Sequence, residues 1–136
     1  MSHNTASKDF KVNGLPIMTI LGSVGSIDGT ATGTTNLYTV PTGRKAVVAG
    51  AVIRVTAVTG FSVAGTAGIG VAAGEDDIFG SAALTGLSGT TIAFVFTKTS
   101  GSLYVAQSTD VVKLGIDTGF TATAITLAVD LFGYLL

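Results

Sequence analysis

The sequence predicts an all-β protein, an antiparallel β-sandwich of about eight strands of the jelly-roll type. Short apolar runs alternate with small or polar residues, as strands do when one face is buried. Thr-Gly dipeptides that begin at residues 32, 42, 59, 85 and 118 separate these runs, and such regular punctuation is typical of an antiparallel sandwich or barrel. No run has a helical period, β-branched residues are frequent in the runs, and eight strands in two sheets are typical of a jelly roll.

The stretch from residue 38 to residue 56 predicts a central hairpin. A short strand ends at Pro41, which fixes φ and removes a donor, and a polar turn leads into a long strand from Ala46 to Thr56. The odd positions from 47 to 55 are all apolar, so we expect them to fill the core. The even positions form an outer face that is too apolar for water alone, and we expect a sister subunit to cover part of it. They are Val48, Gly50, Val52, Arg54 and Thr56.

The other apolar runs predict the remaining strands, and residues 25–36, rich in Gly and Thr, predict a loop. Leu103 and Val105 are expected to face inward, as are the odd positions from 125 to 131. Bare glycines at 68 and 70 would let another backbone approach closely. In chain order, the strands outside the long one are expected at residues 16–24, 37–40, 66–73, 91–98, 102–107, 111–117 and 124–135.

The length of 136 residues favours one domain. Residues 1–14 are polar and end in the turn signal Asn13-Gly14, so they predict a flexible N-terminal arm. This arm is either a solvated tail or a segment that orders on a neighbouring subunit. Residues 15–136 are then expected to form a single β-sandwich domain.

Composition predicts a homo-oligomer and argues against several other partners. Charged residues are only 11% of the chain and apolar residues 47%, whereas a lone soluble protein keeps its exposed apolar patches small. The net charge of −1 and the scattered basic residues give no field that would hold nucleic acid. No membrane partner is expected, because Gly, Thr and Ser interrupt both charge-free windows, 55–74 and 78–97. The N-terminus shows no apolar signal-peptide region.

No catalytic constellation can be assembled from the residues, so we expect no enzyme and no cofactor. The only histidine, His3, lies in the predicted arm, and the chain has no cysteine. A Ser-His-Asp or Cys-His site needs a positioned base beside its nucleophile. The absence of cysteine also excludes disulfides and thiolate zinc sites.

The sharpest charge cluster, Glu75-Asp76-Asp77, is a weak candidate for a metal site. Carboxylate oxygens are the ligands that Ca²⁺ prefers, but no EF-hand spacing surrounds these three residues. Three consecutive carboxylates cannot all converge on one ion. A solvated loop or a salt bridge between subunits is therefore the favoured interpretation.

A second set of residues consists of candidates for an interface. Tyrosines bring both area and a polar tip to a surface, so Tyr38, Tyr104 and Tyr134 could form a sugar-binding or subunit patch. They are equally common at sandwich edges. With the outer face of the long strand, the interface candidates are Val48, Val52, Arg54, Tyr38 and Tyr134.

Four segments carry a resemblance to a known group of proteins. They are YTVPTGRKAVVAGAVIRVT, GIGVAAGEDDIF, STDVVKLGIDTG and TLAVDLFGYLL, within residues 37–136. In their order and spacing they resemble small virion proteins of tailed bacteriophages. Ser108-Thr109-Asp110 stands here where an Ala-Gly-Asp turn is usual in that group.

This resemblance implies a jelly-roll virion component with no catalytic residues. It implies a head decoration, or cement, protein that sits as a homotrimer on the major capsid protein of the phage shell, after assembly in the bacterial cytoplasm. The alternative that the group leaves open is a receptor- or glycan-binding module of a tail, fibre or baseplate.

Overall fold

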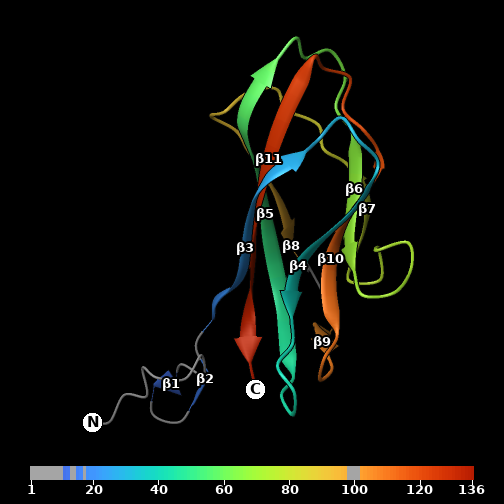
Figure 1. Cartoon of the computed structure of the whole chain (residues 1–136). Coiled ribbons are helices and arrows are strands. Elements are labelled where there is room, and N and C mark those ends of the chain that lie inside the picture. Colours follow the sequence, from blue (N-terminus) through green and yellow to red (C-terminus); the bar gives the residue numbers. More distant parts are fainter. Residues whose placement is uncertain (1–10, 13–14, 17, 98–101) are drawn as a thin grey trace.

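The computed structural model of the chain describes residues 11–12, 15–16, 18–97 and 102–136, and they form an all-β protein. Two antiparallel sheets pack face to face as a sandwich (Figure 1). No helix occurs among the described residues, and therefore none that is long and apolar enough to cross a membrane. The all-β prediction from strand-like alternation is confirmed.

One sheet has five strands and is here called the long-strand sheet. Its strand order is β3-β11-β5-β8, and β9 also pairs with β5. The strands are β3 (Thr19–Asp28), β5 (Ala46–Thr59), β8 (Ala93–Thr97), β9 (Tyr104–Ala106) and β11 (Ala124–Leu135).

The other sheet has four strands in the order β4-β10-β6-β7 and is here called the glycine sheet. Its strands are β4 (Gly33–Thr39), β6 (Thr66–Gly70), β7 (Phe79–Ala83) and β10 (Val111–Thr118). A separate two-stranded pair, β1 (Lys11–Val12) with β2 (Leu15–Pro16), precedes the sandwich. The predicted flexible arm at 1–14 lies largely outside the described residues, so it stays a prediction.

The strand pairing is nested, as in a rolled-up ribbon. The outermost pair is β3 with β11, the next is β4 with β10, then β5 with β8 and β9, and innermost β6 with β7. Successive pairs lie alternately in the two sheets, which is jelly-roll topology. The sandwich has nine strands where about eight were expected, because β7 pairs with β6 in addition to the strands that the sequence predicted.

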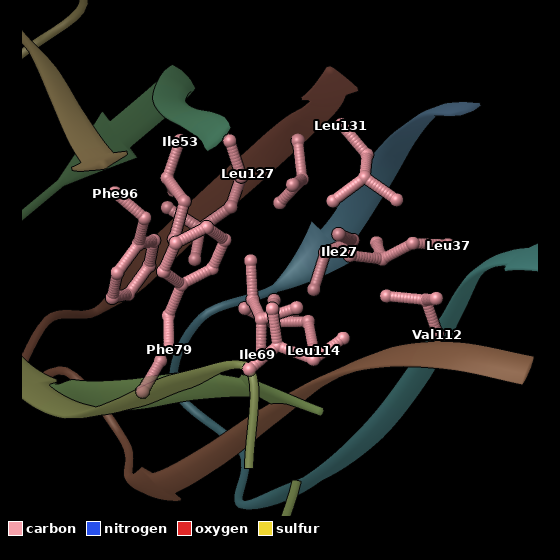
Figure 2. Close-up of a cluster of buried hydrophobic side chains, with 14 of the residues drawn as sticks. Ile27, Leu37, Ile53, Ile69, Phe79, Phe96, Val112, Leu114, Leu127 and Leu131 are labelled. Atoms are coloured by element: carbon pink, nitrogen blue, oxygen red, sulfur yellow. The ribbon is translucent and has the colours of Figure 1, made fainter. Parts of the chain in front are cut away.

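The core lies between the sheets and consists mainly of aliphatic side chains, with Phe79 and Phe96 side by side at one edge (Figure 2). Phe79 of β7 and Phe96 of β8 stack with ring centroids 5.5 Å apart. No charged or polar side chain is buried among the described residues. The inward odd positions predicted in β11 are confirmed, since all four are buried: Ile125, Leu127, Val129 and Leu131.

The predicted central hairpin is wrong, because β4 and β5 belong to different sheets. A tight turn still joins them: the Arg44 amide donates to the Pro41 carbonyl at 3.1 Å, and Gly43 has a φ of 77°. The chain crosses from one sheet to the other at this turn. Apolar alternation cannot distinguish a hairpin from such a crossing, because both have a short turn between two half-buried strands.

The predicted split of odd and even positions in β5 holds only beyond Gly50. Opposite Phe132 and Gly133 of β11, the pairing skips Ala49. Such a bulge places one extra residue in the strand and reverses which parity faces the core. Val48, expected on the outer face, is therefore buried with 1% exposure and cannot be an interface residue.

Two further expectations are corrected by the register. Residues 25–36 are not one loop, because β3 runs to Asp28 and β4 starts at Gly33; both are edge strands, paired by β11 and β10. Val105 pairs with Val47 of β5, which faces outward at that point, so Leu103 and Val105 are exposed at 38% and 40%.

Candidate functional site

Two segments of the phage-like pattern, each of which leads from one sheet to the other, are hydrogen-bonded to each other at one end of the sandwich. The Val40 amide donates to the Asp110 carbonyl at 2.9 Å, and the Thr109 amide donates to the Val40 carbonyl at 3.0 Å. The Gly43 amide donates to the Ser108 hydroxyl at 2.8 Å. These segments therefore act as structural turns that interlock.

The C-terminus joins the same end. Lys45 and Leu136 exchange two backbone hydrogen bonds, and Arg44 Nε donates to the Leu136 carbonyl at 2.6 Å. The Tyr38 ring packs against the core close to this end, and burial raises the pKa of its hydroxyl while nearby Arg44 lowers it. The interface candidate Tyr38 therefore packs partly against the core of its own chain.

Thr109 occupies a position that favours glycine. Its φ is 68°, in the left-handed region where the usual Ala-Gly-Asp turn of the resembling proteins has its glycine. The turn around it is closed because the Asp110 amide donates to the Gln107 carbonyl and the Gln107 amide donates to Asp110 Oδ2.

Replacing Thr109 with glycine is expected to stabilise the protein by about 0.5–1 kcal/mol. The left-handed conformation costs a residue with a side chain about 1–2 kcal/mol, and glycine at this position would avoid that cost. The larger conformational entropy of glycine in the unfolded chain offsets about half of the resulting gain in stability. Urea unfolding would measure the change. Thr109→Ala removes the hydroxyl and keeps the strain, so it should not stabilise; equal gains for both variants would contradict the strain argument.

The acidic loop at 71–78 folds back over the outer face of the glycine sheet. A Cβ added at Gly68 or Gly70 would overlap this loop, and one at Gly115 would lie 2.8 Å from Glu75 Cβ. Gly68 and Gly115 are direct partners across β6 and β10. The predicted close approach over the bare glycines is confirmed, and the chain itself covers the part of this face at Gly68, Gly70 and Gly115.

The metal candidates Glu75, Asp76 and Asp77 are not brought together around an ion. Asp77 Oδ1 accepts hydrogen bonds from the Val71 amide at 2.7 Å and from the Ala72 amide at 3.3 Å. The Glu75 side chain lies over β10 instead. Within the described part of the chain, no three carboxylate, histidine or cysteine side chains form a cluster that could hold a metal. Asp77 therefore closes its own loop by accepting these two backbone hydrogen bonds.

Tyr104 of β9 joins the acidic loop to the long-strand sheet. Burial raises the pKa of its hydroxyl, and the charge of Asp77, a hydrogen bond to Asp77 and the charge of Asp110 raise it further. Tyr104 pairs with the buried Val48, whereas Tyr134 pairs with the outward Val47, so these two tyrosines lie on opposite faces of their sheet. With Tyr38 in the other sheet, the three tyrosines form no common patch.

Tyr104→Phe is expected to reduce the loss of stability in alkaline solution. A folded-state pKa above the unfolded value of 10.0 means that the folded protein resists ionisation. The stability that the neutral hydroxyl contributes is fully present below the unfolded pKa of 10.0 and is lost as the pH rises through the folded-state pKa. Melting temperatures from about pH 8 to about pH 11 would show a shallower decline in the variant. Tyr38 also has a raised pKa, so part of the decline should remain; an unchanged profile would contradict the assignment.

Large apolar side chains are exposed on the outer face of the long-strand sheet. Ile20 of β3 lies beside Phe132 of β11, and Val52 of β5 lies beside Val95 of β8. Ile20 and Val95 are each 54% exposed. An apolar depression of about 210 Å³ lies between Phe132 and Val95, with Met18 at its rim. We call this surface the apolar face; its members are Met18, Ile20, Val47, Ala49, Val52, Val95, Val105 and Phe132.

Two of the predicted interface residues lie on the apolar face or at its charged margin. Val52 is half-buried within it, and Arg54 contacts Asp130 at 3.5 Å. Tyr134, opposite Val47, lies on the same side of the sheet. Sequence analysis missed Phe132, although it shares the outward parity of Asp130 and Tyr134 in β11. It missed Ile20 because bulges in β3 interrupt its alternation.

Comparison with known proteins shows the fold. No protein-family model matches the chain, and no curated protein matches it. Two solved phage structures contain chains of the same fold. One is the capsid asymmetric unit of cyanophage Pam1, with a TM-score of 0.59, 20% identity and coverage of 98% of this chain and 97% of that one. The other is the acidic stable capsid structure of Helicobacter pylori bacteriophage KHP30, with a TM-score of 0.54, 12% identity and coverage of 90% and 97%.

Proposed function

We propose that the chain is a bacteriophage virion structural protein. The observation that carries this proposal is the fold: a jelly roll that matches chains of two phage capsids over 97% of their length. The segments of phage-like pattern support it, because they form hydrogen-bonded turns of this fold. Such a protein acts by contact alone, so we assign it no catalysis and no cofactor.

Within the virion, the role we assign is that of a head decoration protein bound as a homotrimer to the major capsid protein. Three features support this finer assignment. The chain has few charges, it leaves large apolar side chains exposed on one sheet face, and its own loop covers part of the opposite face. A protein that cements a shell needs a stiff body and large apolar contacts.

The alternative role, a receptor- or glycan-binding module of a tail, fibre or baseplate, receives less support. An exposed aromatic cluster would be needed to stack on sugars, and the tyrosines lie on separate surfaces. The depression at the apolar face is lined mainly by apolar residues, two of which, Phe96 and Phe132, are phenylalanines. This surface suits protein contacts better than polar ligands.

Cosedimentation with phage heads tests the proposed function. Purified protein would be mixed with heads of the phage that encodes it, prepared without this protein, and separately with isolated tails. We expect saturable binding to heads and a higher temperature of DNA release from the decorated heads. Binding to tails alone, or to neither, would refute the decoration role.

A further inference from the structure

We draw no further inference here: the strongest candidate, the exposed apolar outer face of the five-stranded long-strand sheet, carries nothing because nothing in the described part of the chain shows what covers it.

Discussion

Replacing Gly133 with alanine is expected to destabilise the protein by about 3 kcal/mol, because the new methyl group has no space. A Cβ at this position would overlap the carbonyl oxygen of Val47 in β5 and lie 2.9 Å from Leu21 Cδ1 in β3. Bulges in both neighbouring strands bring these atoms close: pairing with β11 skips Ala49 in β5 and Leu21 in β3. One of the obstructing atoms belongs to backbone, so a rotamer change cannot relieve the overlap.

Chemical denaturation of Gly133→Ala would measure the loss, with Gly80→Ala as the matched control. Gly80 lies in β7, and an added Cβ there meets no atom within 4 Å. The control should change stability by no more than about 1 kcal/mol, the difference in chain entropy and strand preference. Similar losses for the two variants would contradict the close packing around Gly133. The glycine of the DLFGY segment thus has a structural explanation.

Replacing Gly70 with alanine is expected to lift the acidic loop from the glycine sheet and to cost about 1–3 kcal/mol. The added Cβ would overlap Asp77 Oδ1 and lie 2.7 Å from the Asp76 amide nitrogen and 2.8 Å from the Glu75 carbonyl carbon. Asp77 could then no longer accept hydrogen bonds from the Val71 and Ala72 amides. The loop would then lose the hydrogen bonds that close it, and Asp77 would lose its contact with Tyr104.

Limited proteolysis would detect this change more directly than a melting curve. The protease Glu-C cleaves after acidic residues, so Gly70→Ala is expected to be cut within residues 75–77 faster than wild type. Gly25→Ala, in β3, is the control, because an added Cβ there meets nothing within 4 Å. Equal cleavage rates for the variant and the wild-type chain would show that the loop does not depend on the bare glycines.

Sequence periodicity predicted the fold class and the inward face of β11, because this strand alternates over a long stretch. It also predicted the close approach over Gly68 and Gly70, since two glycines on one strand face leave space that something must fill. The same reasoning failed in β5, where one bulge at Ala49 reverses the parity and buries Val48. Nothing local to the sequence marks a bulge that depends on how the partner strands pair.

The apolar face could be predicted only in part. Val52 and Arg54 follow from the alternation of β5 beyond the bulge. Ile20 comes from a bulged edge strand, and Val95 comes from a strand whose outward face was not assigned. Their assembly into one surface requires the strand order β3-β11-β5-β8, which alternation does not contain. The nested pairing of a jelly roll is a long-range property, and only the structure brings these four strands into one sheet.

Electron cryo-microscopy of the parent phage particle tests the central claim most directly. The account predicts three copies of this jelly roll at each binding site on the outside of the head, in contact with the major capsid protein. Density for the chain in the tail or baseplate, or its absence from the particle, would contradict the account.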